Sequence, residues 1–299
     1  MARQFRFGIN FLEAASGHEW AKKCRYAESL GYDVLLVPDH LGWPAPFPSL
    51  IAAAQATERP RVGTFVLNAG FWNPALLARE VTTADRLSGG RLEVGLGTGY
   101  VRSEFEDAGI PFGTPGSRVD HLEHTVAELD RLLTDPEYEP RPEQSPKPPL
   151  LVGGNGKRVL RLAARHAQIA AFTGAEQAPG QPAGTMRLLS AETIAERVAA
   201  FGEYTRGRAV LPELNILVQR VAVTDDPQAA AHKLQPYAPH LTEEQILQVP
   251  TLLVGTVREI AERLRANRER FGFTYVTVLE PSMEEMAPVI AELRRQDGE

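Results

Sequence analysis

The sequence has little cysteine, no excess of basic residues and no long apolar run. Cys24 is the only cysteine among 299 residues, which excludes an intrachain disulfide and any zinc or iron–sulfur site built from several thiolates. Lysine and arginine number 32 against 38 aspartate and glutamate residues. A nucleic-acid partner is therefore not expected, because such a partner needs a basic surface.

No apolar run reaches the roughly 18 residues of a membrane span, and the first residues lack the apolar core of a signal peptide. A lone cysteine fits a reducing compartment. We therefore expect a cytoplasmic protein without a membrane partner. The content of 43% hydrophobic and 23% charged residues is typical of a folded globular chain.

Short apolar segments alternate with stretches of helical spacing, as in parallel sheets whose strands are joined by helices. Eight strands are expected, at residues 5–11, 34–38, 62–67, 92–98, 150–153, 169–172, 214–223 and 274–279. Length alone also allows two domains. Eight strand–helix units instead predict a single α/β domain over residues 1–299, a (β/α)8 TIM barrel with insertions after strands 4, 6 and 7.

The segments between the strands differ in character. Residues 73–88 predict a helix with an asparagine cap, proline at its first position and a glycine-rich stop. Residues 135–149 contain six prolines and are expected to form a loop. Residues 174–184 are interpreted either as a mobile lid or as a surface insertion. Residues 226–250 are interpreted as a small helical excursion.

Polar residues follow the second and fourth predicted strands, at the end of the barrel where active sites lie. Asp39 and His40 place a carboxylate beside an imidazole that titrates near neutral pH, and Asp39 is expected to orient that ring. They form either a proton-transfer site or a strand-end turn. Thr98 and Tyr100 are candidates to bind a ligand, and Glu104 joins them if residues 101–107 form a short helix.

Glycines at alternate positions mark the end of the fourth strand, at Gly95, Gly97 and Gly99. Without side chains, this strand end allows either the approach of a planar ring or tight packing of the barrel neck. A dinucleotide-binding turn is excluded, because the G-x-G-x-x-G pattern requires glycine where Tyr100 stands.

A glycine-rich turn follows the fifth strand and precedes the predicted helix 159–166. Such a turn presents free backbone amides and the positive end of a helix dipole, which suits a phosphate group. Lys157 and Arg158 are expected to add positive charge. A plain strand–helix connection is the alternative. The candidate phosphate-binding residues are Gly153, Gly154, Asn155 and Gly156.

Two further groups are less specific. His121 and His124 have a spacing that allows metal chelation, but charged neighbours on a solvated helix explain the same pattern, so no metal is expected. Four aromatic residues follow the second and third strands and either wall an apolar substrate pocket or pack beneath loops: Trp43, Phe47, Phe71 and Trp72.

Six segments, in this order, resemble the bacterial luciferase-like monooxygenase superfamily, and within it the branch that uses the deazaflavin coenzyme F420. They are VPDH (37–40), GTFVL (63–67), NPALLA (73–78), LSGGR (87–91), GLGTG (95–99) and LVGGNG (151–156). The resemblance runs nearly end to end. It implies a TIM barrel with the cofactor ring across the strand ends and its phosphate at residues 153–156.

The resemblance also implies roles for individual residues. A non-proline cis peptide that backs the ring is expected at Phe65–Val66. Thr98 corresponds to a ring-contacting position, and His40 is expected to act as a base or proton relay. Asp39, which precedes His40, is a further candidate to bind the cofactor. Tyr100 stands where some related dehydrogenases have an acidic residue, which argues against their alcohol or sugar chemistry.

The expected reaction is hydride transfer between reduced coenzyme F420 and an electron-poor C=C, C=N or C=O group of a small organic or natural-product substrate. The catalytic candidates are His40, Tyr100 and Glu104, with His40 or Tyr100 supplying the proton. A monooxygenase that uses reduced FMN and a non-catalytic flavin-binding protein are the alternatives. Resemblance to dimeric relatives implies a homodimer.

Overall fold

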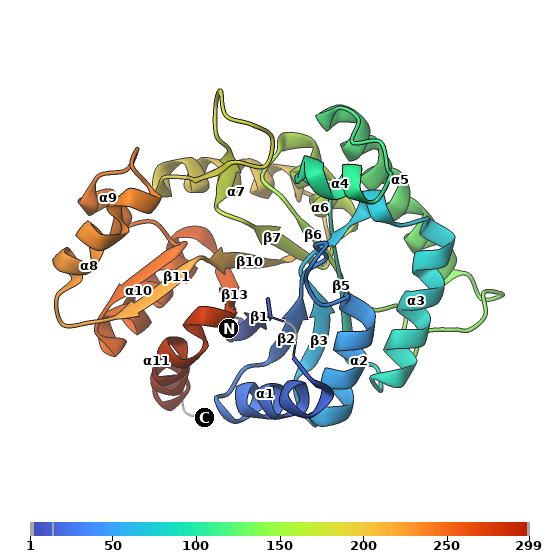
Figure 1. The fold of residues 1–299 in the computed structure, drawn as a ribbon, viewed down its shortest axis with the longest axis horizontal. Coiled ribbons are helices and arrows are strands. Elements are labelled where there is room, and N and C mark those ends of the chain that lie inside the picture. The colour runs from blue at the N-terminus through green and yellow to red at the C-terminus, as the bar shows by residue number, and fades with distance from the viewer. Residues whose placement is uncertain (1–2, 14, 298–299) are drawn as a thin grey trace.

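The computed structural model describes residues 3–13 and 15–297, and its centre is a closed parallel β-barrel surrounded by helices (Figure 1). The barrel order is β1-β2-β3-β5-β6-β7-β10-β13, and β13 pairs with β1 to close it. Within the described residues these eight strands are β1 (Arg6–Asn10), β2 (Val34–Val37), β3 (Arg61–Thr64), β5 (Leu92–Gly97), β6 (Leu150–Gly153), β7 (Ile169–Phe172), β10 (Glu213–Val218) and β13 (Phe273–Leu279). The predicted (β/α)8 barrel is confirmed.

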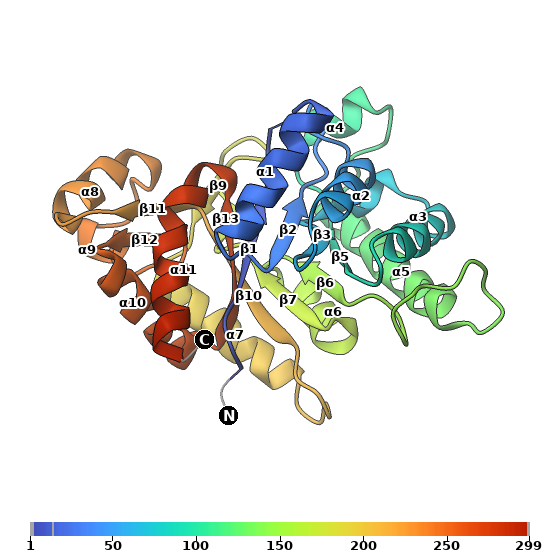
Figure 2. The same ribbon diagram turned by 90° about the horizontal axis from the view of Figure 1, so that it is seen from below.

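Helices pack around the barrel on all sides (Figure 2). Several begin where a serine or threonine accepts a hydrogen bond from the first turn, as Ser16, Thr114 and Thr256 do. The helices are α1 (Gly17–Ser29), α2 (Pro46–Ala56), α3 (Pro74–Leu87), α4 (Arg102–Asp107), α5 (Pro115–Thr134), α6 (Lys157–His166), α7 (Ala191–Tyr204), α8 (Pro227–Leu234), α9 (Glu243–Ile246), α10 (Val257–Phe271) and α11 (Met283–Asp297). Among the described residues, no helix is both long and apolar enough to cross a bilayer.

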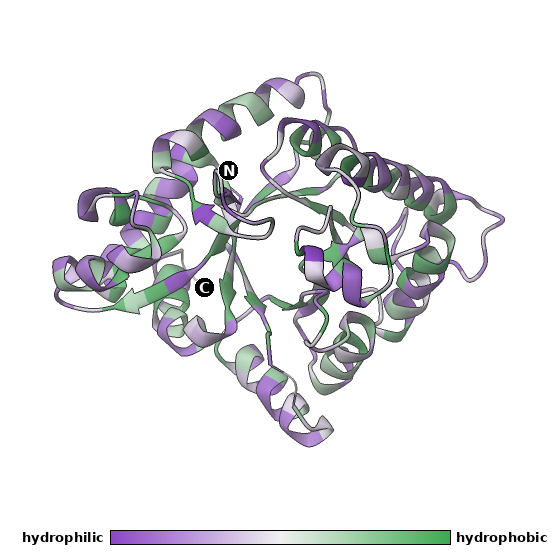
Figure 3. Ribbon diagram, turned by 45° about the horizontal axis from the view of Figure 1, so that its top comes forward, coloured by the Kyte–Doolittle hydropathy of each residue, from purple (hydrophilic) through white to green (hydrophobic). Residues whose placement is uncertain are grey.

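Apolar residues form one layer between strands and helices and a second inside the barrel, and the strands are the most hydrophobic elements in Figure 3. The interior includes Leu36, Phe65 and Tyr275. At the amino-terminal ends of the strands, Arg6 forms ion pairs with Glu93 and Glu213. These ion pairs close the end of the barrel opposite the expected site, where the fold keeps residues that serve stability.

Two predicted strands are interrupted. The third breaks after Thr64 and resumes as β4 (Leu67–Asn68), which pairs with β5. The predicted strand 214–223 is wrong as a single strand, because it divides at Gln219, whose backbone N–H donates to Thr251. Its second half, β11 (Arg220–Val223), leaves the barrel and pairs with β12 (Leu252–Gly255), a strand the sequence analysis missed.

The expected insertions follow strands 4, 6 and 7 of the barrel, after β5, β7 and β10. The segment 174–184, interpreted as a mobile lid or a surface insertion, contributes to an antiparallel hairpin of β8 (Ala175–Gln177) and β9 (Met186–Leu188). The Gln177 side chain bridges the hairpin turn, since it donates to Pro182 O and accepts from Gly184 N. The proline-rich segment 135–149 forms a loop as predicted. Helices α8 and α9 form the predicted helical excursion.

Candidate active site

The mouth of the barrel brings His40 and Glu104 together. His40 follows β2, and Glu104 lies in the first turn of α4, the short helix on which its candidacy depended. His40 Nδ1 lies 2.7 Å from Glu104 Oε1, and the two side chains are 21% and 14% exposed. A carboxylate at this distance holds the imidazole ring in one orientation, while the pair stays open to the mouth.

Two aromatic rings flank the imidazole. The Trp43 ring centroid lies 4.7 Å from that of His40, and the Tyr100 centroid lies 5.8 Å away, both in edge-on geometry. Partial burial and the nearby Glu104 carboxylate raise the pKa of Tyr100 above its usual value of 10.0. Tyr100 is therefore a neutral hydroxyl donor at physiological pH, beside the imidazole and carboxylate.

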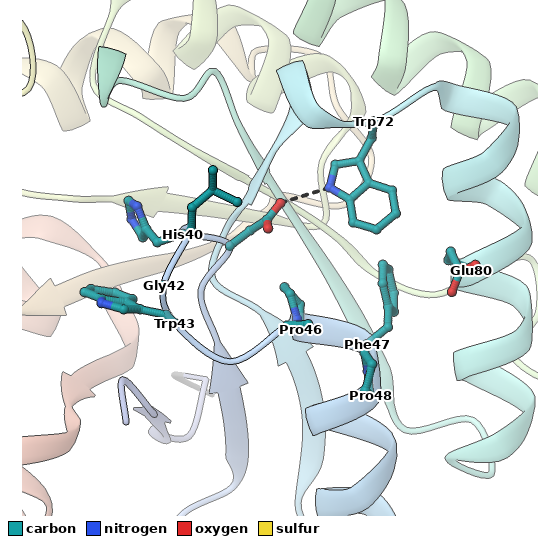
Figure 4. Close-up of a pocket in the computed structure, with 11 residues that line it drawn as sticks. His40, Gly42, Trp43, Pro46, Phe47, Pro48, Trp72 and Glu80 are labelled. Carbon is teal, nitrogen blue, oxygen red and sulfur yellow. Dashed lines mark hydrogen bonds between the residues drawn. The ribbon is translucent and has the colours of Figure 1, made fainter. Parts of the chain in front are cut away.

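The structure places Asp39 apart from this pair. Its carboxylate accepts hydrogen bonds from Trp72 Nε1 at 2.9 Å, drawn in Figure 4, and from Asn68 N at 3.2 Å. The expectation that Asp39 orients His40 is corrected, because Glu104 makes that contact instead. Burial raises the pKa of Asp39, although the hydrogen bonds from Trp72 and Asn68 oppose the increase.

The break between β3 and β4 is a bulge centred on Phe65 and Val66, whose peptide bond is cis, as the family resemblance implies. Phe65 is buried in the barrel interior, and Val66 packs against the same cluster. This bulge therefore lies inside the barrel, next to the ends of β5 and β6.

The glycines of β5 leave room for this bulge. A Cβ atom on Gly97 would lie 2.7 Å from Val66 Cγ2, and one on Gly95 would lie 2.1 Å from Thr64 O. Tight packing of the barrel neck thus explains both glycines. Gly99 has a positive φ of 68°, and a Cβ atom there would meet Asn68 Oδ1 at 2.2 Å. Thr98 lies between these glycines at the mouth and is half-buried.

The turn at residues 153–156 opens α6, with Gly156 as a cap that offers no side chain. The first amides of α6 therefore point away from the helix, without intrahelical acceptors. The Asn155 amide donates to Thr173 Oγ1 and, at 2.6 Å, to Ala175 O, while its buried Oδ1 has no partner in the described structure. Free amides suit a phosphate group, and the unpaired Oδ1 suits a hydroxyl donor.

Arg158 does not serve this turn as expected. Its guanidinium pairs with Asp120 at 2.7 Å and with Glu123 at 2.6 Å, both on α5. Lys157 remains exposed beside the turn. His121 Nε2 hydrogen-bonds Ala69 O at 2.9 Å, so this histidine joins α5 to the loop before α3.

An open pocket of about 260 Å³ lies beside the loop that joins β2 to α2. Figure 4 shows the His40 and Trp43 rings on one side of this loop and Trp72 and Phe47 on the other. Three of the four predicted aromatics line the pocket, whereas Phe71 packs against Phe105. No motif or spacing pointed to Glu80, which lies on α3 and also lines the pocket. The lining residues are Asp39, His40, Leu41, Gly42, Trp43, Ala45, Pro46, Phe47, Pro48, Trp72 and Glu80.

Known proteins share both the sequence pattern and the fold. An FMNH2-dependent dimethylsulfone monooxygenase of Pseudomonas putida is 26% identical over 254 residues, 72% of this chain and 68% of the relative. An F420-dependent glucose-6-phosphate dehydrogenase of Intrasporangium calvum is 36% identical over 120 residues, 36% of each chain. The solved structure of an F420-dependent secondary alcohol dehydrogenase superposes with a TM-score of 0.72 and 18% identity, over 98% of this chain and all of that one.

Other relatives carry no assigned activity. Uncharacterised proteins of Mycobacterium tuberculosis are 28% and 30% identical, over 46% and 50% of this chain, and the chain spans 60% and 65% of their length. Enzymes named for reduced FMN and for F420 thus both occur among the proteins that this chain resembles. The family model described as luciferase-like monooxygenase matches residues 11–275. The chain therefore belongs to the luciferase-like monooxygenase family.

Proposed function

We propose that this protein is an F420-dependent oxidoreductase that transfers hydride between the reduced deazaflavin and an electron-poor C=C, C=N or C=O group of a small organic or natural-product substrate. The observation that carries the proposal is the hydrogen-bonded pair of His40 and Glu104 at the barrel mouth. A reaction of this kind requires the protein to orient two molecules and to manage one proton.

The cofactor fits the residues at the mouth. Phe65 and Val66 would back the ring, Asp39 and Thr98 would bind it, and the turn at residues 153–156 would hold the phosphate. The unpaired Asn155 Oδ1 would accept a hydrogen bond from a ribityl hydroxyl, which satisfies a buried acceptor. When bound, the deazaflavin supplies a ring carbon that carries hydride and reacts poorly with oxygen.

The chain's own groups move the proton. Glu104 holds His40 Nδ1, so Nε2 is the nitrogen left to exchange a proton with the substrate. The Tyr100 hydroxyl, which is neutral at physiological pH, is the second donor at the mouth. Glu104 thus supplies the carboxylate that is missing from the position of Tyr100.

A reduced-FMN monooxygenase is the second candidate. Its support is the match to the FMNH2-dependent enzyme of Pseudomonas putida over 72% of the chain. The free amides at residues 153–156 and the Asn155 acceptor suit FMN equally well, because both cofactors carry a ribityl chain and a phosphate. The discrimination must therefore come from direct binding.

The test is a titration of cofactor-free protein with coenzyme F420 and, separately, with FMN, followed by ligand fluorescence. Tight binding of the deazaflavin alone supports the proposal, whereas preferential FMN binding favours the monooxygenase. An oxygen electrode then provides an independent assay, because only the monooxygenase consumes oxygen in response to substrate, above the autoxidation of reduced FMN itself.

We also propose a homodimer that forms through α2 and α3. Helix α2 contains no charged residue, and the outer face of α3 exposes Leu76 and Leu87, each at 52%. A second copy would bury these side chains, which water otherwise contacts. Sedimentation equilibrium tests this proposal, with Leu76→Lys as the variant expected to shift the protein toward monomer.

A further inference from the structure

A second groove lies on the outside of the barrel, between α5 and α6. Its volume is about 360 Å³. Three arginines from α6, at positions 158, 161 and 165, line it at helical spacing and therefore share one face of the helix. The other lining residues are Glu123, Leu162 and His166.

The charges of these arginines are balanced unequally. Arg158 is paired with Asp120 and Glu123. Arg161 lies 5.0 Å above the Tyr204 ring, a contact that leaves its charge uncompensated by any acid. In the described part of the chain, neither Arg161 nor Arg165 has a carboxylate within ion-pair distance. The side chains of Arg161 and Arg165 thus give the groove two positive charges that are available to bind an anion.

The acid nearest the His166 end of the groove already has two partners. Asp130 on α5 pairs with His166 Nδ1 at 2.8 Å and with Lys147. It therefore does not neutralise Arg165 by a direct contact. The lining contains more positive than negative side chains from Arg158 to His166, a path of roughly 12 Å at 1.5 Å per residue.

The groove adjoins the proposed phosphate-binding turn at the start of α6. Arg158 lies in the first turn of α6, directly after the turn at residues 153–156. A molecule whose phosphate binds that turn, and which continues beyond the phosphate, has a short route onto the arginine face. This step rests on the proposed function. FMN ends at its phosphate, whereas coenzyme F420 continues through a phosphodiester into a chain of γ-linked glutamates.

We propose that the groove between α5 and α6 binds the oligoglutamate tail of coenzyme F420. Each glutamate adds a carboxylate, and arginine binds carboxylates through paired N–H groups. Arg161 and Arg165 are the residues that hold the tail. The groove therefore favours coenzyme F420 over FMN through contacts that lie outside the reacting centre.

The experiment compares two probes: coenzyme F420 with one glutamate and coenzyme F420 with five or more. Fluorescence titration gives their Kd values for the unaltered protein, for Arg161→Gln/Arg165→Gln and for the control Arg206→Gln, which alters an exposed arginine paired with Glu203 elsewhere on the surface. An exposed ion pair contributes about 0.2–1 kcal/mol, so two pairs predict a long-tail preference of roughly two- to 30-fold. The double variant should lose this preference and the control should retain it.

Two further measurements sharpen the result. Arg161→Lys/Arg165→Lys keeps both charges and should retain most of the preference, and salt near 1 M, where the Debye length is about 3 Å, should abolish it. Since Arg161 stacks on Tyr204, Arg165→Gln alone provides a variant that leaves this contact intact.

The titrations distinguish a failure of the groove assignment from a failure of the proposed function. Equal affinity for both forms of coenzyme F420, or an unchanged preference in Arg161→Gln/Arg165→Gln, overturns the groove assignment and leaves the proposed function standing. Binding of FMN with no binding of either F420 form overturns the proposed function and the groove assignment together.

Discussion

Replacing Gly97 by alanine tests whether the β5 glycines are required by the bulge at residues 65–66. The new Cβ would lie 2.7 Å from Val66 Cγ2, well inside van der Waals contact. Val66 is β-branched and cannot swing away without leaving its preferred rotamer. Overpacking of this kind costs about 1–3 kcal/mol, so we expect Gly97→Ala to lower the free energy of unfolding by that amount.

Removing the obstructing methyls should relieve the cost. Val66→Ala alone deletes two partly buried methyl groups and is expected to cost up to about 1.6 kcal/mol, at roughly 0.8 kcal/mol each. In Val66→Ala/Gly97→Ala the close contact disappears. The double variant should therefore be about as stable as Val66→Ala, which corresponds to a coupling energy of about 1–3 kcal/mol between the two positions.

Urea unfolding of the four proteins measures this coupling, and titration with coenzyme F420 and FMN shows whether a displaced bulge also weakens cofactor binding. Gly202→Ala is the matched control, because no atom lies within 4 Å of the added Cβ. Gly202 lies in the last turn of α7, so the change should stabilise by less than the roughly 0.5–1 kcal/mol of a helix interior. Strictly additive costs for Gly97→Ala and Val66→Ala would refute the argument, because they would show that the two side chains do not meet.

Three other predictions address the site and the core. His40→Ala should lower turnover by about 10²- to 10⁴-fold with little change in cofactor Kd, and an unchanged kcat would contradict the role of His40. Glu104→Gln loses a charged hydrogen bond of about 1.5–3 kcal/mol, so it should lower turnover by about 10- to 150-fold. Burial raises the pKa of Asp39, so its ionisation disfavours the folded state. The free energy of unfolding of the unaltered protein, taken relative to that of Asp39→Asn, should therefore fall as pH rises from the usual aspartate range through the raised pKa. Urea unfolding across that pH range measures this difference, and a difference that rises with pH would contradict the argument. Burial raises the pKa of Cys24 to about 12, so a thiol-specific disulfide reagent should label it only as the protein unfolds, and rapid labelling of the native protein would count against its burial.

The barrel was predictable because its strands and helices are encoded by local patterns. Alternating apolar segments identify seven of the eight barrel strands to within a few residues, and the remaining prediction, 214–223, runs through β10 into β11. The short helix that carries Glu104 was a condition of the sequence argument, and the structure contains it. His40 and Tyr100 could be singled out as proton-transfer candidates because each follows a strand end by a few residues, and their roles stay a prediction. The cis bond at Phe65–Val66 came from family resemblance, because no local pattern distinguishes it.

The pairings inside the site required the tertiary structure. Asp39 is the neighbour of His40 in the sequence, yet Glu104, 64 positions away, makes the hydrogen bond. Arg158 was assigned to the phosphate turn, but it pairs with acids on α5. In both cases the nearest residue along the chain differs from the nearest residue in space, because β-barrel closure brings separate strand ends and helix faces together.

The sequence by itself therefore determined the order and type of the elements that form the barrel and the end of the barrel where polar residues gather. Tertiary packing decided which atoms meet there, why the β5 glycines are needed, and where β11 leaves the barrel to pair with β12. The physical reason is one of range: helix and strand periodicity acts over a few residues, whereas hydrogen bonds, ion pairs and close contacts depend on atoms that only the closed barrel brings within a few ångströms.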